Sequence, residues 1–476
     1  MRDLTSLLTL AACLLGSAAA TGVAEDRPNV LLIVVDDLRF DDFGAAGHPF
    51  SKTPNIDRLA REGAHFQNMF AVTPLCSPSR ATILTGLHTR NHGILDNTDR
   101  SPRSHELQTF ARHLHDSGYN TGFIGKWHMG NDPTPRPGFD SWAAMPGQGE
   151  AIDPQLYEHG RLARVQGYAT DIFTEKALTF INQKRSGPFM LMLSHKALHP
   201  NVLQNADGTI VSIGEGGFIP ADRHKSLYAH LTPPRRGNYG VPPHGKPALE
   251  RLIPGLAPLG PGTVTTDDTI RDRLRMLVAV DESLGRIMDA LQKQGALDHT
   301  VIMLIGDNGY FYGEHGLSEE RRLAYEESIR LPLLIRYPPK IRAGSTPAAQ
   351  VLTTDLAPTI VDLAHAKPLS GIDGRSLVPL FGATQTPADW RHSFLIEYTT
   401  DIVFPRVLTM GYDAVRTERY KYIRYRELEG MNELYDLQTD PFEQKNLVSE
   451  TSSSDLRRRM EGELDTLLKV PPKYRN

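Results

Sequence analysis

The chain has 476 residues, of which 40% are hydrophobic and 23% are charged, the ordinary composition of a folded globular protein. Lys and Arg together number 52 and Asp and Glu 56, so the net charge of -4 gives no basic excess for a nucleic-acid partner. After the N-terminus, no apolar stretch is long enough to span a bilayer. This excludes global disorder and a multi-span membrane protein, and it leaves room for a large α/β domain with an appendage.

Residues 1–24 are predicted to contain a secretory signal peptide. Arg2 supplies positive charge, residues 7–15 form the apolar stretch, and three alanines at 18–20 offer a cleavage site. Two alternatives stay open: a lipoprotein signal with Cys13 as the lipidated residue, and a buried N-terminal helix. The prediction implies a secreted or periplasmic protein with no transmembrane segment in the mature chain.

Removal of such a signal leaves Cys76 as the single cysteine of the mature chain. One thiol cannot form an internal disulfide, and a reactive thiol is a liability in an oxidising compartment. Cys76 is therefore either buried and inert or present for chemistry, and composition alone does not decide between the two.

Four apolar stretches are each followed directly by polar residues. Continuous apolar stretches are typical of parallel strands that are covered on both faces. Helical patterns lie between them, over residues 54–63 and 269–294. This alternation predicts an α/β fold with a large, mostly parallel sheet between helices, and ligands bind at the carboxyl ends of such strands. The stretches are 30–35 before Asp36 and Asp37, 123–125 before Lys126 and His128, 189–193 before His195 and His199, and 301–305 before Asp307 and Asn308.

Two segments depart from this alternation. Residues 200–266 are rich in Pro and Gly and follow directly after His199, so we expect an insertion that faces the substrate. Beyond about residue 385 the pattern changes to antiparallel strands around 414–425 and a polar helix over 454–469. We expect a catalytic domain over 25–384 and a smaller C-terminal α+β subdomain over 385–476.

Cys76 lies at the predicted start of a helix. Ser77 suits the N-cap and Pro78 the first helical position, so free backbone N–H groups would face Cys76. Arg80 follows about one turn later and could reach the same group. Such a site suits an activated nucleophile that faces an anionic substrate.

Oxygen donors at two strand ends point to a metal site. Three carboxylates and one amide suit Ca²⁺ or Mg²⁺ rather than zinc, and such an ion would neutralise an anionic substrate. Lys126, His128 and His199 add a cation and two candidates for proton transfer. The alternative is a set of separate salt bridges and buried histidines. The donors are Asp36, Asp37, Asp307 and Asn308.

With these motifs the sequence resembles the formylglycine-dependent sulfatases of the alkaline-phosphatase superfamily, along nearly the whole mature chain. The resemblance implies the alkaline-phosphatase-like fold and the hydrolysis of sulfate esters, with sulfated carbohydrate as the expected substrate class. The motifs are Cys76-Ser77-Pro78-Ser79-Arg80 with Leu84-Thr85-Gly86, residues 118–128, Asp36-Asp37 with Asp307-Asn308-Gly309, and residues 434–437 with Asp440-Pro441 and Asn446-Leu447.

The resemblance also implies a role for each site residue. A formylglycine-generating enzyme would oxidise Cys76, and the hydrated gem-diol would attack sulfur to form a covalent enzyme–sulfate. Arg80 would hold the diol, and Lys126 would bind a sulfate oxygen. His199 would protonate the leaving alcohol, and His128 would take a proton from the second hydroxyl. The expected ligands of one Ca²⁺, with Mg²⁺ less favoured, are Asp36, Asp37, Asp307, Asn308 and the modified Cys76.

One position departs from the family pattern. Many members carry a Lys four residues before the segment that begins at Tyr325, and here that place is Arg321. Arg keeps the positive charge but presents a planar fork, so we expect contact with sulfate rather than proton donation. His195, close to His199, is interpreted as supporting or structural.

Two other functions stay open. Phosphonate monoester hydrolases and related phosphodiesterases share the Cys76 signature, and a site with Arg80, Lys126, Arg321 and a divalent ion could accept either ester. A secreted module that binds sulfated glycans without hydrolysing them is the second alternative, and the complete set of nucleophile and metal ligands argues against it. The sequence does not identify which sulfated substrate is used.

Overall fold

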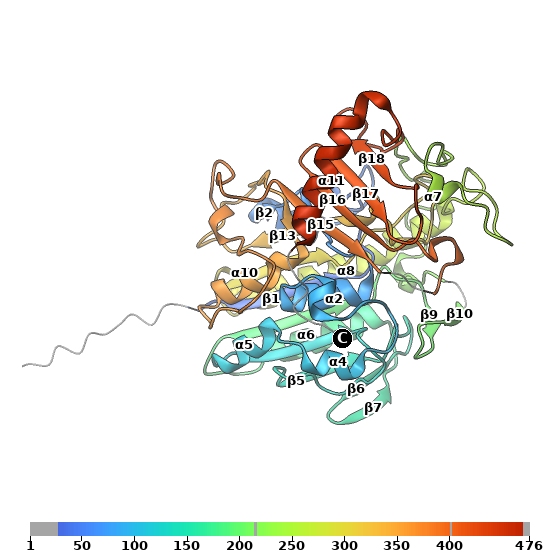
Figure 1. The fold of residues 1–476 in the computed structure, drawn as a ribbon. Helices are drawn as coiled ribbons and strands as arrows, with labels where there is room; N and C mark the ends of the chain where they lie inside the picture. The colour runs from blue at the N-terminus through green and yellow to red at the C-terminus, as the bar shows by residue number, and fades with distance from the viewer. Residues whose placement is uncertain (1–26, 214–216, 400–401, 470–476) are drawn as a thin grey trace, which may run out of the picture.

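The computed structural model describes residues 27–213, 217–399 and 402–469, and the predicted signal peptide lies outside them. A nine-stranded sheet forms the centre of the molecule, in the order β2-β13-β11-β1-β8-β4-β5-β6-β7 (Figure 1). Its strands are β1 (Asn29–Val35), β2 (Ala64–His65), β4 (Asn120–Lys126), β5 (Ser141–Met145), β6 (Gln155–Glu158), β7 (Arg161–Arg164), β8 (Phe189–His195), β11 (Thr300–Gly306) and β13 (Leu333–Arg336).

The five central strands β11, β1, β8, β4 and β5 run parallel to one another. Four of them contain the apolar stretches predicted from the sequence, and β8 and β11 are buried along their whole length. Because adjacent parallel strands end at the same edge of a sheet, the polar residues that follow these four strands are brought to one place. The predicted α/β fold with a mostly parallel sheet is confirmed.

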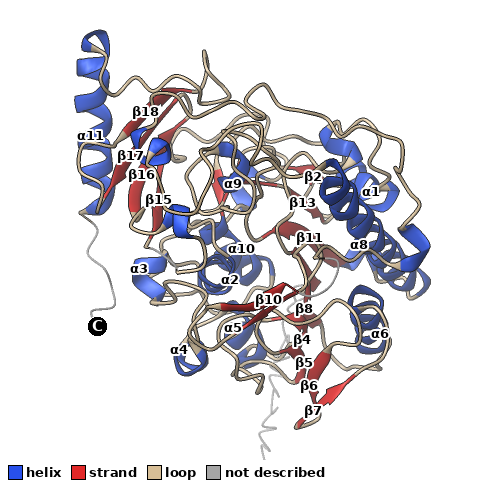
Figure 2. Cartoon of the chain, turned by 90° about the vertical axis from the view of Figure 1, so that its right-hand side faces the viewer, coloured by secondary structure: helices blue, strands red, loops and turns tan. Residues whose placement is uncertain are grey.

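Helices cover both faces of this sheet (Figure 2). Side chains alternate between the faces of a strand, so β1 contributes to two cores: Leu32 packs with residues of α2, α5 and α10, and Ile33 with residues of α1, α6 and α8. The helices predicted over 54–63 and 269–294 are α1 and α8. The bounds are α1 (Pro54–Glu62), α2 (Cys76–Thr85), α5 (Phe110–Asp116), α6 (Ala169–Ile181), α8 (Asp267–Lys293) and α10 (Leu356–Leu363).

Short elements complete this part of the chain. The segment 200–266, which shows no periodicity in the sequence, contains an antiparallel hairpin of β9 and β10 with an irregular register. The elements are β3 (Met69–Phe70), β9 (Val202–Gln204), β10 (Ile210–Ile213), β12 (Arg330–Leu331), β14 (Val351–Leu352), α3 (Thr89–His92), α4 (Ser101–Glu106), α7 (Pro247–Glu250), α9 (Glu326–Ile329) and 3-10 turns at Gly44–Ala46, Asp222–His224, Leu297–His299, Thr353–Asp355, Val378–Leu380, Pro405–Val407 and Thr451–Ser453.

The C-terminal part forms a separate four-stranded antiparallel sheet, drawn in orange and red in Figure 1. Its strands β16 and β17 and the final helix α11 lie where the sequence predicts strands and a helix, and β15 and β18 add two strands that the sequence pattern does not show. Helix α11 buries Met460 and Leu464 against one face. The bounds are β15 (Ser393–Tyr398), β16 (Tyr412–Thr417), β17 (Tyr420–Tyr425), β18 (Glu433–Asp436) and α11 (Ser454–Leu468).

A buried ion cluster joins this C-terminal sheet to α9. Glu326 of α9 contacts Arg416 Nε at 3.0 Å and Lys421 Nζ at 2.9 Å, and Lys421 Nζ lies 2.8 Å from Glu443 Oε1. Burial acts to raise the pKa of Glu326, but Arg416 and Lys421 more than offset this and hold it well below its usual range. The cluster therefore fixes the segment that follows Arg321.

In the described part of the chain, no helix combines the length and the apolar character needed to cross a membrane.

The ion cluster predicts a large effect of one substitution. Lys421→Met removes an ammonium group that lies between two buried carboxylates, Glu326 and Glu443. We expect a loss of roughly 3–5 kcal/mol in the free energy of unfolding, because an uncompensated buried charge remains. Lys445→Met is the control, since Lys445 and its partner Glu450 are 67% and 36% exposed, and it should cost about 1 kcal/mol or less. Urea unfolding measures both, and equal losses would contradict the role of the cluster.

Candidate active site

The ends of β1 and β11 bring the predicted metal ligands together. Asp36 and Asp37 follow β1, Asp307 and Asn308 follow the neighbouring β11, and all four side chains are fully buried. The backbone N–H groups of Asp37 and Asn308 both donate to Asp307 Oδ1, at 3.1 and 2.9 Å. One carboxylate thus holds the two strand ends against each other.

Cys76 lies at the N-terminus of α2, but the helix begins two residues earlier than predicted and the predicted N-cap is wrong. The structure places Leu75 at the N-cap, and Ser77 is already inside the helix. The N–H of Ser77 donates to Asn97 Oδ1 at 3.0 Å, and its hydroxyl donates to the carbonyl oxygen of His128. Partners from distant segments have replaced the local capping bond, and they place the backbone of His128 beside Cys76.

The residues present fit a divalent cation. One ligand atom each from Asp36, Cys76 and Asp307 lie within 4.8 Å of one another. Asp37 Oδ2 and Asn308 Oδ1 are buried and have no hydrogen-bond partner among the described residues. A buried oxygen without a partner is costly, and a hard cation that prefers oxygen ligands would satisfy both atoms.

Three buried cations lie against the three carboxylates. Taking a charge out of water is costly unless an opposite charge compensates it, so the cations and carboxylates stabilise one another. Burial acts to raise the pKa of Asp36, but Lys126 and Arg80 more than offset this and lower it well below its usual range. The pairs are Asp36 with Lys126, Asp307 with Arg80 (Nε to Oδ2, 2.9 Å) and Asp37 with Arg321 (Nε to Oδ1, 2.6 Å).

In the absence of a bound cation, the same surroundings keep the thiol of Cys76 protonated. Burial raises its pKa to about 12; Lys126 opposes the rise, and Asp36 and Asp307 add to it. The thiolate is the nucleophilic form of cysteine, so an unmodified Cys76 is a poor nucleophile at neutral pH. Without a cation and without modification, Cys76 therefore fits the inert thiol, one of the two interpretations that the sequence left open.

Both candidate proton-transfer residues reach the site. His128 follows β4 and His199 follows β8, and both side chains are buried. Burial and then Lys126 lower the pKa of each well below its usual range. Each ring is therefore neutral at neutral pH in the absence of substrate, which suits His128 as a proton acceptor.

His195 has the surroundings of a structural residue. Its Nε2 lies 3.4 Å from the hydroxyl of Ser283 on α8, and its ring lies beside Phe173 of α6. Burial lowers its pKa to about 4, so the ring is neutral at neutral pH. These contacts agree with the interpretation that His195 supports the fold.

Sequence reasoning missed two cations near the site. Arg273 of α8 is fully buried and donates to the carbonyl oxygens of Asp37 (2.6 Å) and Leu198 (3.1 Å), so it ties the metal-site turn to the loop of His199. Lys196 is buried and donates to the carbonyl of Pro200 at 2.8 Å; burial and Lys126 lower its pKa to about 7. The sequence could have indicated that Arg273 is buried, because its helical spacing with Leu277 and Val280 places it on the apolar face of α8.

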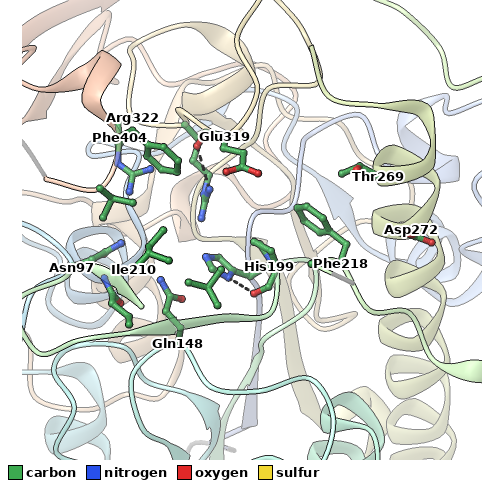
Figure 3. A pocket seen from close by; sticks show the side chains of 16 residues that line it. Asn97, Gln148, His199, Ile210, Phe218, Thr269, Asp272, Glu319, Arg322 and Phe404 are labelled. Atoms are coloured by element: carbon green, nitrogen blue, oxygen red, sulfur yellow. Dashed lines mark hydrogen bonds between the residues drawn. The ribbon is translucent and has the colours of Figure 1, made fainter. Parts of the chain in front are cut away.

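A cavity of about 220 Å³ lies beside this cluster and is lined by His199 and Arg321. Figure 3 shows Phe218 and Phe404 on different sides of it, with His199 between them and Gln148 below. Part of the lining, including Gln204 and Phe218, comes from the segment 200–266. Phe404 comes from the C-terminal part, so three distant segments meet at one cavity.

The sequence model of the Sulfatase family matches residues 28–366, and that of the C-terminal region of N-sulphoglucosamine sulphohydrolase matches residues 313–470. The chain belongs to the sulfatase family. Sulfatases generally use a formylglycine and a divalent metal ion, and the cluster of Asp36, Cys76 and Asp307 offers a place for both.

Known proteins support this assignment. The sulfatase is 33% identical to N-acetylglucosamine-6-O-sulfatase of Bacteroides thetaiotaomicron, over 93% of this chain and 87% of the relative. A solved structure of a protein in complex with its substrate D-glucosamine-2-N,6-O-disulfate superimposes with a TM-score of 0.81 at 30% identity, covering 94% of this chain and 100% of that one. A phosphonate monoester hydrolase of Agrobacterium radiobacter superimposes with a TM-score of 0.73 at 24% identity, over 93% and 95% of the chains, which shows a shared fold alone.

The metal site predicts an effect of chelation on stability. A cation that binds only the folded state stabilises it, by about 2.7 kcal/mol at a hundredfold excess over Kd, so EDTA should lower the Tm and Ca²⁺ should restore it. Asp307→Asn should abolish most of this shift because it removes a carboxylate from the site. Asp222→Asn changes an exposed carboxylate and is the control. Metal content by mass spectrometry and thermal unfolding measure both, and an unchanged shift in Asp307→Asn would refute the assignment.

Proposed function

We propose that this sulfatase hydrolyses sulfate esters of carbohydrates and that a formylglycine made from Cys76 is its nucleophile. The observation that carries the proposal is the thiol of Cys76, which is buried among three carboxylates and three cations and has a pKa of about 12. A thiol that stays protonated at neutral pH gains a function there when a formylglycine-generating enzyme converts it into a hydrated aldehyde.

The proposed substrate class is 6-O-sulfated glucosamine or N-acetylglucosamine. The name of the relative with 33% identity and the bound substrate of the solved structure with 30% identity both point to this class. The cavity supports this, because Phe218 and Phe404 offer apolar faces for a sugar ring while Asn97 and Gln148 offer amides for its hydroxyl groups. The phosphonate alternative has less support, since the matching phosphonate hydrolase shares the fold at lower identity.

The proposed division of work follows the positions of the side chains. Lys126 and Arg321 bind sulfate oxygens, and Arg80 holds the diol. The ion, which we propose to be Ca²⁺, withdraws charge from sulfate and diol oxygens when it is bound. After attack on sulfur, His199 gives a proton to the leaving alcohol, and His128 takes a proton as sulfate leaves. The proposed ligands of the ion are Asp36, Asp37, Asp307, Asn308 and the modified Cys76.

His199 needs its substrate in order to act as an acid. Its Nδ1 donates to the carbonyl of Pro200 at 2.9 Å, so Nε2 is the atom left for the substrate. Burial, Lys126 and Arg321 lower its pKa, and the negative charge of a bound sulfate ester acts in the opposite direction. Binding of the ester thus raises the fraction of His199 that carries the proton required by the leaving group.

We also propose a division of the chain into three parts. Residues 1–24 serve as a secretory signal, residues 25–384 form the catalytic domain, and residues 385–476 form the C-terminal subdomain. The insertion over 200–266 shapes substrate selectivity, which is supported by its share in the cavity wall. Such an enzyme works outside the cytoplasm on sulfated glycans.

The nucleophile is tested by the mass of one peptide. We expect the tryptic peptide 62–80 of active enzyme to carry an aldehyde oxygen in place of the sulfur of Cys76. The Cys76→Ala variant should release no sulfate from 6-sulfated glucosamine, as measured by ion chromatography, because it lacks the attacking hydroxyl. An intact thiol in fully active protein would overturn the proposal and point to attack by water instead.

The role of Arg321 is tested by two substitutions. Arg321→Leu removes a charged contact to sulfate, so kcat/KM should fall roughly 10- to 100-fold, the value of a charge-assisted hydrogen bond. Arg321→Lys keeps the charge and restores the residue common in the family, so it should stay within about tenfold of the unaltered enzyme. Steady-state kinetics measure both variants. An unchanged kcat/KM in Arg321→Leu would contradict the proposed contact between Arg321 and sulfate.

A further inference from the structure

Gln204 of the β9–β10 hairpin contacts the ring of His128. The amide nitrogen of Gln204 donates to the carbonyl oxygen of Gly208 at 2.9 Å. Because a carbonyl can only accept, this bond fixes the orientation of the amide. Its other end, Oε1, lies 3.1 Å from His128 Nε2. An amide oxygen can also only accept, so Nε2 of His128 must carry the hydrogen of this bond.

The opposite side of the ring is left for the reaction. His128 Nδ1 is buried and has no hydrogen-bond partner among the residues that the structure describes. The charged groups acting on the ring are Lys126, Arg80 and Asp36, and all three also act on Cys76. The backbone is held as well, since the hydroxyl of Ser77 donates to the carbonyl of His128.

We propose that Gln204 is a positioning residue that keeps the hydrogen of neutral His128 on Nε2 and thereby makes Nδ1 the atom that accepts the proton when sulfate leaves. This inference rests on the proposed function and adds to it a residue from outside the family motifs. It assigns the hairpin a part in the second half of the reaction, besides lining the cavity.

Sulfate leaves residue 76 as His128 takes a proton. The O–H bond of the hydroxyl that remains on Cβ of residue 76 breaks, and its proton moves to Nδ1 of His128. The electron pair of that bond forms the C=O of the aldehyde, while the bond from Cβ to the sulfate oxygen breaks and its pair leaves with sulfate. Water takes the proton from Nδ1 afterwards, which returns His128 to its neutral form.

The first test separates the two half-reactions. Gln204→Leu should lower kcat about 10- to 100-fold, the usual effect of losing a group that orients a reacting side chain, with little change in the first turnover. An aryl sulfate should then give a burst of phenol, and peptide 62–80 should be found carrying sulfate. Gln204→Glu keeps an acceptor for Nε2 and should restore most of the rate. Asn205→Ala removes a hydrogen bond to Thr209 in the same hairpin and should leave kcat unchanged.

The second test reads the hydrogen position directly, in protein that keeps Cys76 as a thiol. Nitrogen-15 shifts of the histidine rings, with His128→Gln to identify the signal, should show the hydrogen on Nε2, and Gln204→Leu should change that pattern. A hydrogen on Nδ1 in the unaltered chain, or a fall in kcat without any sulfated peptide, would overturn the proposal. If the unaltered chain releases no sulfate, the proposed function fails, and the nitrogen shifts still decide the role of Gln204.

Discussion

The structure depends on one constraint: three carboxylates and three cations are buried together at the carboxyl edge of the central sheet. Burying any one of these charges without its partner would reduce the stability of the fold by several kcal/mol. The geometry of each ion pair must therefore be accurate. Strands β1 and β11 supply the carboxylates, and β4, α2 and the loop before α9 supply Lys126, Arg80 and Arg321. Formation of the central sheet therefore also assembles the site.

The same burial decides which chemistry is open to the site. Burial raises the pKa of the Cys76 thiol to about 12 and keeps His128 and His199 neutral, so neither a thiolate nor a charged imidazole is present before substrate and cation bind. Two needs follow, a nucleophile and an acid, and the proposed formylglycine at residue 76 and an anionic ester beside His199 would meet them. Both needs agree with the chemistry that is general to the sulfatase family.

Segments far from the reacting centre form the cavity. The hairpin contributes Gln204, the segment before α9 contributes Arg321, and the C-terminal part contributes Phe404. The ion cluster around Lys421 keeps β17 of the C-terminal sheet, a strand that follows Phe404 in the chain, against α9, which follows Arg321. Loops on a rigid scaffold commonly carry selectivity in this way, while strand ends carry the chemistry.

The sequence alone determined four of the five central strands, helices α1 and α8, and the polar residues after those strands, because apolar stretches and helical periodicity are local patterns. Short strands such as β2 and β18 leave no such pattern, and the tertiary structure alone shows them. It also decided the partners of polar groups. The hydroxyl of Ser77 donates to the carbonyl oxygen of His128 instead of capping its own helix. Gln204 forms a hydrogen bond with His128, which lies 76 residues earlier in the chain. Such contacts join distant segments and depend on how these pack, which no local pattern records.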